Sequence, residues 1–291
     1  MFLVTGATGG IGRRVVRLLR QREQYVRAFV RLTSRYSELE YRGAEIFIGD
    51  LQLEKDIQKA TRGAKYIISA HGSDGDALSL DYRANIELID QAKVNGVQHF
   101  VFISVLGADR GYEDAPTFKA KRAVEQYLEA SGVNYTILRP SGLASNLLPL
   151  AEQFRETELY LLIGDRKNRS SIVSTDDLAK IVVDSVTVEG ARNQTLAVGG
   201  PEILLREDIP RIFGRIFNKE PVVINSPLFV IDGLRSGLGL FNPQAQTALG
   251  TYRTLLANEF FCTKDEIAKL EAIFNFKLET LENFLRRYLA V

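Results

Sequence analysis

The glycine-rich segment Val4 to Gly12, VTGATGGIG, constrains the fold more than any other part of the chain. The apolar run MFLV leads into this segment, and the following GRRVVRLLRQRE carries apolar residues at helical spacing. Gly6, Gly9 and Gly12 stand three residues apart, so the backbone can turn sharply and approach a ligand closely. The pattern predicts a strand, a tight turn and a helix whose first N–H groups suit a pyrophosphate. The alternative is a glycine-rich turn with no ligand.

Short β-rich runs alternate with helical patterns from the start to about residue 140, which is typical of a parallel sheet covered by helices on both faces. An amphipathic stretch, LSLDYRANIELIDQAKVNGV, predicts a helix between the fourth and fifth strands. We therefore predict an α/β fold in which residues 1–140 form a Rossmann-like, doubly wound parallel sheet. The predicted strands are Phe2 to Thr5, Tyr25 to Val30, Glu45 to Ile48, Tyr66 to Ala70, Phe100 to Ser104 and Tyr135 to Leu138.

After residue 140 the alternation loosens, and SGLASNLLPL predicts a loop that leaves the sheet. We expect residues 141–291 to form a smaller lobe, with a segment near 170–200 returning to the main sheet. That segment holds a helix capped by Ser174 and Thr175 and an edge strand at Leu196 to Val198. Thr263 opens a capping box, and TLENFLRRYLAV predicts a closing helix. The apolar stretch PLFVIDGLRSGLGLFNP is expected to be buried, with a partner surface or a lid as alternatives.

Composition excludes several classes of function. The 37 basic and 36 acidic residues balance, so no global charge recruits nucleic acid or an anionic membrane. Cys262 is the only cysteine, and His71 and His99 are the only histidines, so we expect no disulfide framework and no metal site. Apolar runs are too short to cross a bilayer, and the first strand already belongs to the fold, so no signal peptide is expected. These features favour a cytoplasmic protein.

The end of the second predicted strand indicates which dinucleotide is bound. In proteins of this fold that prefer NAD(H), an acidic residue at this point holds the ribose 2′-hydroxyl. Here the strand ends at Arg31, and Arg13 and Arg35 are expected nearby. Guanidinium groups suit a 2′-phosphate because they stay charged and donate two parallel hydrogen bonds. We therefore predict NADP(H) rather than NAD(H); the alternative is that these arginines are solvated surface charges.

Two further strand ends are expected to contact the nucleotide. Asp50 and Leu51 follow the third strand and are predicted to hold the adenine, although Asp50 could equally cap the next helix. Ala70, His71 and Gly72 follow the fourth strand, and their small size suits a floor beneath the ribose and pyrophosphate. The His71 ring is interpreted as a packed or solvent-facing group rather than a catalyst. Residues Thr8, Gly10 and Ile11 complete the predicted glycine loop.

Five segments together resemble a known family. They are TGATGGIG, GDL, FVFISVLGAD, KAKRAVEQYLEASGVNYTILRPSG and GGPEILLREDI. The chain resembles an atypical short-chain dehydrogenase/reductase of the NmrA-like, NAD(P)-binding branch over nearly its whole length. Within that branch it is similar to cyanobacterial and plastid members described as quinone-binding or photosystem assembly factors, with the ending LETLENFLRRYLAV as a further likeness.

The resemblance implies a catalytic serine after the fifth strand and a tyrosine four residues before a lysine. Lys121 matches the lysine, whereas Thr117 stands at the tyrosine position and Leu106 at the serine position. A threonine hydroxyl cannot replace a phenol, because its pKa lies far outside the working range. The resemblance implies that Lys121 binds the nicotinamide ribose and acts as a general acid; the alternative is a surface lysine. Ser104 and Pro140 complete the predicted cofactor contacts, and Tyr112 and Tyr127 are alternative acids that lack the expected spacing.

Two functions of different class fit these observations. The first is an NADPH-dependent oxidoreductase that reduces a small planar acceptor such as a quinone or an enone. The second is a non-catalytic NADP(H)-binding redox sensor or assembly factor with a protein partner. Sugar-nucleotide epimerisation ranks last, because it needs the tyrosine that Thr117 replaces.

The substrate pocket is expected between the strand ends and the smaller lobe. Most of the residues expected to line it suit a core equally well: Leu106, Leu143, Asn146, Leu147, Leu148 and Phe154.

Overall fold

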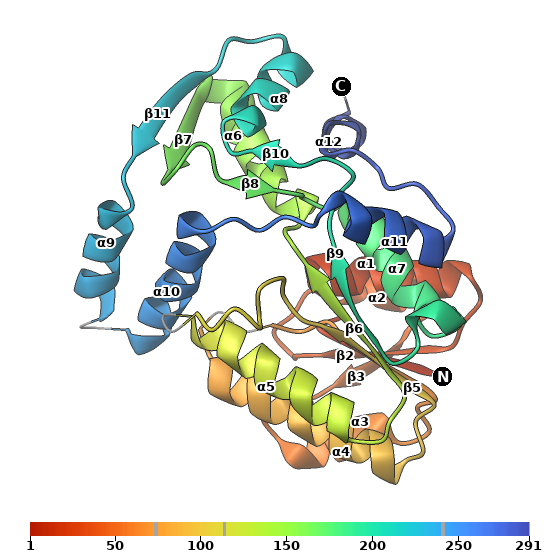
Figure 1. The fold of residues 1–291 in the computed structure, drawn as a ribbon. Helices are drawn as coiled ribbons and strands as arrows, with labels where there is room; N and C mark the ends of the chain where they lie inside the picture. Colours follow the sequence, from red (N-terminus) through yellow and green to blue (C-terminus); the bar gives the residue numbers. More distant parts are fainter. Residues whose placement is uncertain (73–74, 113–114, 240–241, 291) are drawn as a thin grey trace. The chain divides into compact units, whose positions relative to one another are not determined.

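The computed structural model describes residues 1–72, 75–112, 115–239 and 242–290, and Figure 1 shows its ribbon. The chain divides into two compact units. Unit 1 comprises Met1–Arg139 and Leu178–Leu196, and unit 2 comprises Pro140–Asp177 and Ala197–Val291. Each unit has its own core and is described by itself.

Unit 1 is built on a seven-stranded parallel sheet, which confirms the predicted Rossmann-like α/β fold. The strand order is β3-β2-β1-β4-β5-β6-β9. The order reverses between β1 and β4, and ligands bind outside the carboxyl ends of strands at such a switch point. The strands are β1 Phe2–Thr5, β2 Val26–Val30, β3 Glu45–Ile48, β4 Tyr66–Ser69, β5 His99–Ile103, β6 Tyr135–Pro140 and β9 Gln194–Val198.

Helices cover both faces of this sheet. In Figure 1, α3, α4 and α5 lie on one face, and α1 lies on the other. The core beneath α3, α4 and α5 contains Phe100 and Phe102 of β5 and Leu128 of α5, which are wholly buried. A parallel sheet with helices on both faces buries apolar side chains on each face. The helical elements are α1 Gly10–Gln21, α2 Ser37–Tyr41, α3 Glu54–Thr61, the π-helix η1 Ala77–Arg83, α4 Ala84–Val94, α5 Pro116–Ala130, α7 Thr175–Asp184 and η3 Glu189–Ala191.

Unit 2 packs helices around an aromatic core. Phe154, Phe213 and Phe284 are wholly buried in that core. Thr263 forms the predicted capping box at the start of α11, and Pro210 lies in the first turn of α8, where its missing N–H costs little. The elements are η2 Ala144–Leu147, α6 Leu148–Thr157, β7 Leu159–Ile163, β8 Arg169–Ser170, β10 Leu204–Leu205, α8 Asp208–Phe217, β11 Val222–Ser226, α9 Phe229–Gly239, α10 Pro243–Ala257, α11 Lys264–Phe274 and α12 Leu281–Leu289.

The loop predicted over SGLASNLLPL is wrong for residues 144–150, which form η2 and the first turn of α6. Residues 141–143 lie outside the helices. Pro149 lies within that first turn, where a helix leaves N–H groups unpaired in any case, so the proline favours a helix start rather than a loop. Ala151 and Phe154 on the same helix then pack into the core of unit 2.

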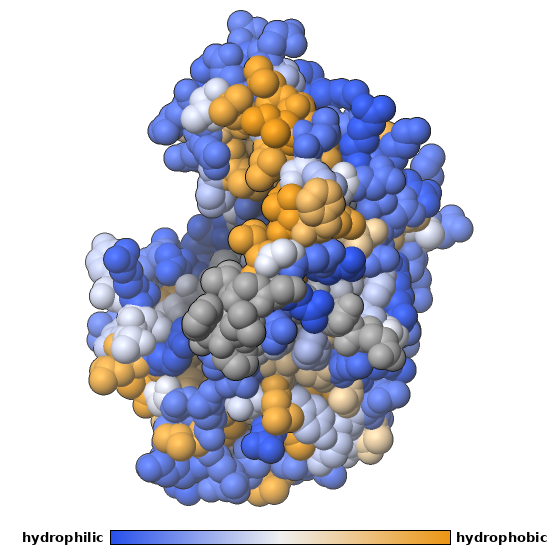
Figure 2. Space-filling model, turned by 90° about the vertical axis from the view of Figure 1, so that its left-hand side faces the viewer, coloured by the Kyte–Doolittle hydropathy of each residue, from blue (hydrophilic) through white to orange (hydrophobic). Residues whose placement is uncertain are grey.

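The expectation that PLFVIDGLRSGLGLFNP is buried is wrong for Phe229 and Leu234 in α9, which are 70% and 50% exposed, whereas Ile231 is buried. Residues 240–241 lie outside the described residues. The two-stranded parallel sheet of β7 and β11 leaves Leu159, Leu161 and Ile224 exposed as well, and Figure 2 shows apolar surface on this side of the molecule. A two-stranded sheet has too few neighbours to cover both of its faces.

Two absences apply to the described ranges. None of the helices there is long and apolar enough to cross a membrane. Nor do those ranges hold three or more potential ligand side chains grouped closely enough for a metal ion.

Candidate functional site

The turn between β1 and α1 forms a cradle with no room for side chains. Gly6 has a φ of +65°, and a Cβ placed on it would lie 2.5 Å from the carbonyl oxygen of Ala70 and 2.6 Å from the backbone nitrogen of His71. A Cβ on Gly12 would lie 2.2 Å from the carbonyl oxygen of Gly6. The glycine loop is therefore pressed against the end of β4 at the switch point of the sheet. A dinucleotide pyrophosphate fits such a cradle, because only bare backbone permits its close approach.

The start of α1 is suited to an anion. Gly9 precedes the helix without a side-chain cap, and the first turn carries no acidic residue. The helical hydrogen bonds begin with Arg13 N–H donating to Gly9 O at 3.0 Å. The N–H groups of Gly10, Ile11 and Gly12 have no helical carbonyl one turn before them, as at every helix start. The guanidinium of Arg13 also donates to the carbonyl of Thr8 at 3.2 Å, which braces the loop.

Basic residues surround the end of β2. Arg31 and Arg35 are exposed and take part in no ion pair within the described part of the chain. Arg13 lies 3.6 Å from the carboxylate of Glu38 on α2, and Glu38 also accepts a hydrogen bond from Arg42. Sequence reasoning missed Glu38, although its i, i+4 spacing from Arg42 is the signal of a short helix there. Arg31 and Arg35 thus present unneutralised positive charge at the strand end.

Asp50, which follows β3, was predicted either to contact adenine or to cap the next helix, and the structure contradicts the second alternative. The carboxylate of Asp50 accepts from the Gln52 N–H at 2.9 Å, and α3 begins after Leu53 without a side-chain cap. Asp50 therefore does not cap α3, and its contact with adenine stays a prediction. Leu51 packs against the core and, with Gln52, lines a pocket of about 350 Å³ between α3 and the η1–α4 segment.

The side chain of His71 ties three elements together. Its Nε2 donates to the carbonyl of Leu80 in η1 at 3.0 Å, since a carbonyl can only accept. Its Nδ1 then accepts from the hydroxyl of Thr5, at the end of β1, at 2.8 Å. Burial lowers the pKa of His71 to about 4, with the positive charge of Lys121 acting in the same direction. The ring is therefore a packed group that is neutral near pH 7, and the backbone nitrogen of His71 is the atom that the cradle approaches.

Lys121 is buried. It is 8% exposed, and its Nζ donates to the carbonyl of Ile103 at the end of β5 at 2.9 Å. The same Nζ lies 5.1 Å from the centroid of the Phe102 ring. Burial lowers the pKa of Lys121, while the negative charges of Asp81 and Glu125 act in the opposite direction. The interpretation of Lys121 as a surface lysine is therefore wrong.

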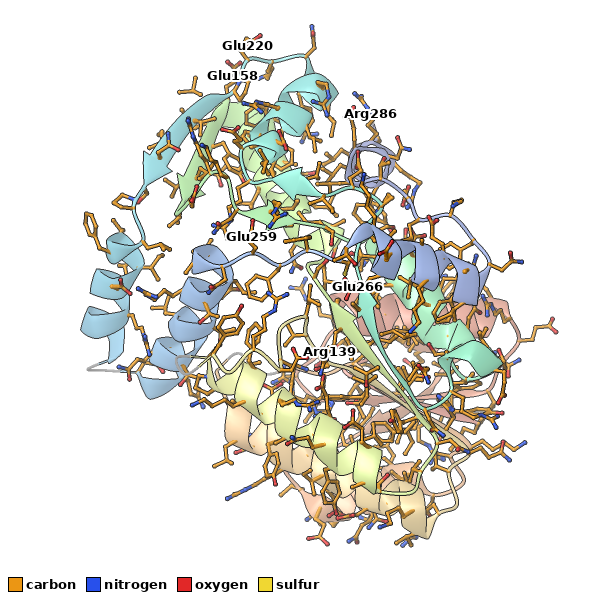
Figure 3. The ribbon with its side chains drawn as sticks, viewed as in Figure 1. Arg139, Glu158, Glu220, Glu259, Glu266 and Arg286 are labelled. Carbon is orange, nitrogen blue, oxygen red and sulfur yellow. The ribbon has the colours of Figure 1, made fainter. Side chains whose placement is uncertain are left out.

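A buried ion network stands beside Lys121. Glu125 is wholly buried, and Arg139 donates to both of its carboxylate oxygens at 2.8 and 2.7 Å. The hydroxyl of Ser104 donates to Glu125 at 2.6 Å, and Arg139 also donates to Asp109 at 2.6 Å. Figure 3 labels Arg139, which closes β6 beside α5. The pKa of Arg139 is raised, first by its hydrogen bond with Glu125. Sequence reasoning missed this pair; the one available signal was Glu125 one turn after Lys121 on the same helix.

Comparison with known proteins assigns the family. The family model described as NAD(P)H-binding matches residues 6–189. The chain belongs to this NAD(P)H-binding family. The match confirms the predicted resemblance to atypical short-chain dehydrogenases/reductases and covers the glycine cradle, the strand ends and Lys121.

Individual relatives of this family carry different names. The photosystem II assembly factor Ycf39 of Cyanophora paradoxa is 26% identical over 298 residues, which cover 98% of this chain and 91% of that protein. The NAD(P)H azoreductase of Xenophilus azovorans is 32% identical over 70% of this chain and 69% of its own. The crystal structure of the NADPH-dependent quinone oxidoreductase QOR2 of Escherichia coli complexed with NADPH matches with a TM-score of 0.77, at 18% identity over 99% of this chain and 100% of that one. This structural likeness shows the fold.

The remaining candidates for acid groups lie as follows. Thr117 is half-buried on α5, four residues before Lys121, and Leu106 is buried after β5. The ring of Tyr112 stands edge-on to Phe118 with 5.4 Å between centroids. Tyr127 is exposed and donates to Asp90 at 2.6 Å. Tyr127 thus points away from the buried face that carries Lys121.

The predicted substrate-lining residues fall in both units. Leu106 belongs to unit 1, whereas the others belong to unit 2. Phe154 is wholly buried, with its ring 5.7 Å from that of Phe213, and therefore serves the core of unit 2. Asn146 is exposed, while Leu143, Leu147 and Leu148 are half-buried, and Pro140 is buried at the end of β6. The substrate lining stays a prediction, as do the cofactor contacts of Ser104 and Pro140.

Proposed function

We propose that this protein is an NADPH-dependent reductase that acts on a small planar acceptor, such as a quinone or an enone, with Lys121 as the proton donor. The observation that carries the proposal is a lysine buried at the carboxyl end of β5, on the sheet edge that holds the glycine cradle. A lysine is buried at a cost, so its position there is a functional indication.

Different residues bind different parts of the dinucleotide. The glycine loop and the start of α1 hold the pyrophosphate, and Ala70 to Gly72 border it from β4. Arg31 and Arg35 hold the 2′-phosphate, because they supply the positive charge at the end of β2. A bound nicotinamide supplies the hydride. The family is NAD(P)H-binding, and the quinone oxidoreductase of similar fold was solved with NADPH.

Lys121 then supplies the proton. Burial makes its ammonium a stronger acid than an exposed lysine, which brings its pKa towards the working pH of a general acid. The Nζ proton passes to the oxygen, or to the reduced carbon framework, of an acceptor that has received two electrons, and solvent returns a proton to Nζ. The carbonyl of Ile103 and the Phe102 ring orient the ammonium. Reductase names among the relatives, including the azoreductase of Xenophilus azovorans, support this reading.

The test measures oxidation of bound NADPH at 340 nm against a panel of quinones and enones. Lys121→Met should lower the rate of the responding acceptor by about a hundredfold or more, the usual contribution of a positioned acid. Lys119→Met is the matched control, because Lys119 is exposed on the same helix and should keep the full rate. An unchanged rate in Lys121→Met would show that Lys121 is not the acid.

A second candidate function is a non-catalytic, NADP(H)-responsive assembly factor or sensor. The observations that favour it are Thr117 and Leu106 in place of the usual hydroxyls, together with the likeness to the assembly factor of Cyanophora paradoxa. The exposed apolar surface of β7, β11 and α9 offers a place for a protein partner. NADPH must then bind two states unequally. Tight NADPH binding without oxidation by any acceptor, combined with NADPH-dependent hydrogen exchange in β11, would favour this function.

A further inference from the structure

Asp81 lies in a π-helical turn that the sequence does not predict. The amphipathic pattern over residues 78–97 indicates one regular helix, but Ala77–Arg83 form the π-helix η1. Two side chains fix this turn: Nε2 of His71 donates to the carbonyl of Leu80, and Nδ2 of Asn85 donates to the carbonyl of Asp81 at 2.9 Å. Wide turns of this kind are often found at functional sites. The backbone position of Asp81 is thus set by buried hydrogen bonds.

The carboxylate of Asp81 is directed towards the end of β4. Asp81 is wholly buried, and a Cβ placed on Gly72 would lie 4.0 Å from its Oδ1. The π-helix η1 packs against α5, the helix that carries Lys121. Asp81 therefore lies at the same sheet edge as the glycine cradle and Lys121.

The Phe102 ring of β5 lies 5.1 Å from the Lys121 ammonium, measured from Nζ to the ring centroid. Three titratable groups interact with this ammonium electrostatically: Asp81 from η1, Glu125 from α5 and His71 from the end of β4. His71 is neutral near pH 7, because burial lowers its pKa to about 4. Glu125 is already matched by the bidentate guanidinium of Arg139. Asp81 is the larger of the two negative influences that raise the pKa of Lys121.

We propose that ionised Asp81 is the counter-charge that keeps Lys121 protonated and holds its ammonium at the carboxyl end of β5. Asp81 is a positioning residue, since it acts through Lys121 rather than on the substrate. Thr117 offers no phenol, and in the proposed reductase function the proton comes from Lys121, which has to stay charged to supply it. A charge of opposite sign stabilises that charged form. The catalytic consequence rests on the proposed reductase function, whereas the pairing of Asp81 with Lys121 does not.

The direct test is a pH titration of lysines labelled with ¹³C at Cε, followed by NMR without any acceptor. The Lys121 signal is assigned by its loss in Lys121→Met. Asp81→Asn should lower the pKa of Lys121 by about one pH unit or more, as expected for loss of a close opposite charge. Asp90→Asn is the matched control, since Asp90 lies on α4 and accepts from the exposed Tyr127. An unshifted Lys121 titration in Asp81→Asn would overturn the proposal.

A second measurement covers the case in which Asp81→Asn folds poorly. Thermal unfolding is compared for Asp81→Asn, Lys121→Met and the double variant. A coupled buried pair predicts that the double variant unfolds at a higher temperature than Asp81→Asn, because no unmatched buried charge remains. Strictly additive losses would overturn the pairing.

The kinetic consequence separates the two proposals. In Asp81→Asn, the alkaline limb of the pH–rate profile should move to lower pH by the shift measured by NMR. Lack of turnover by the wild-type protein on every acceptor would defeat the reductase function, while the NMR and unfolding results would still decide the role of Asp81.

Discussion

The β1–α1 turn and the β5–α5 region both lie at the carboxyl ends of the sheet's strands, but they differ in the residues that form them. The turn works through missing side chains, because Gly6 and Gly12 bring bare backbone against the end of β4. The β5–α5 region works through buried charges, with Lys121, Glu125 and Arg139 removed from most of the solvent. The difference teaches that the proposed nucleotide site depends on the shape of one short segment, whereas the proposed proton transfer depends on charge balance among segments far apart in the sequence.

Removal of Glu125 should give the largest effect. Glu125→Ala removes the buried carboxylate that both Arg139 and Arg122 contact and leaves Arg139 with the more exposed Asp109, so we expect the free energy of unfolding to fall by about 3–5 kcal/mol. Urea unfolding followed by circular dichroism measures this loss. Glu129→Ala on the exposed side of the same helix is the control and should change the free energy by less than about 0.5 kcal/mol. A small loss in Glu125→Ala would mean that charge balance is unimportant in this region.

A methyl group in the cradle tests the other side of the comparison. Gly12→Ala places a Cβ 2.2 Å from the carbonyl oxygen of Gly6, so the turn must open. We expect the Kd for NADPH, measured by calorimetry, to rise by about a hundredfold, which corresponds to about 2.7 kcal/mol. Gly233→Ala has open space around the new methyl group and is the control. Unchanged NADPH affinity in Gly12→Ala would place the nucleotide elsewhere.

The histidine between the two regions should make stability depend on pH. Burial lowers the pKa of His71 to about 4, so as pH falls below 6.5 the unfolded chain gains a proton before the folded protein does. Stability is therefore lost between pH 6.5 and 4, and His71 should account for about 2 kcal/mol of the loss between pH 7 and pH 5.

Urea unfolding at pH 7 and pH 5 measures that loss. His71→Gln removes the titrating ring and should reduce the difference between the two pH values. His99, whose pKa burial also lowers to about 4, supplies the remaining slope in the variant. An equal pH difference in His71→Gln and in the wild type would contradict the interpretation that His71 is a buried ring, uncharged at pH 7, whose protonation destabilises the fold.

The smallest expected effect concerns the choice of nucleotide. Arg31→Ala should weaken NADPH binding by about tenfold, or about 1.4 kcal/mol, because one charge-assisted contact is lost. NADH has no 2′-phosphate, so its affinity should stay unchanged. Arg155→Ala, an exposed arginine of unit 2, is the control. Equal losses for both nucleotides would show that Arg31 does not read the 2′-phosphate.

The sequence predicts the cradle well and the charged region poorly, for a physical reason. Gly6, Gly9 and Gly12 act within one turn, so their spacing alone indicates the strand–helix unit and the bare backbone to which we assign the pyrophosphate. Glu125 and Arg139 lie on different elements and meet only in the folded sheet, and no local pattern encodes their bond. Asp81 depends on a π-turn fixed by His71 from another strand end, which helical periodicity cannot indicate.

The same contrast explains the errors outside the site. Apolar residues in α9 were expected in the interior, because hydrophobicity alone does not say whether enough of the chain is available to cover them. The stretch SGLASNLLPL was predicted to be a loop, although its Pro149 stands in the first turn of α6, where a proline is compatible with a helix. Both errors concern tertiary context rather than local preference.

The order of strands along the chain has a consequence for biosynthesis. The outer strand β9 pairs with β6, yet the chain between them first runs through η2, α6, β7 and β8. At about 5–20 residues per second, the backbone groups along the edge of β6 stay open for roughly 3–11 s while that segment is made. An open edge invites pairing with other chains. Slower translation across residues 141–193 should therefore lower the yield of folded protein in the cell, even if the finished sheet is equally stable.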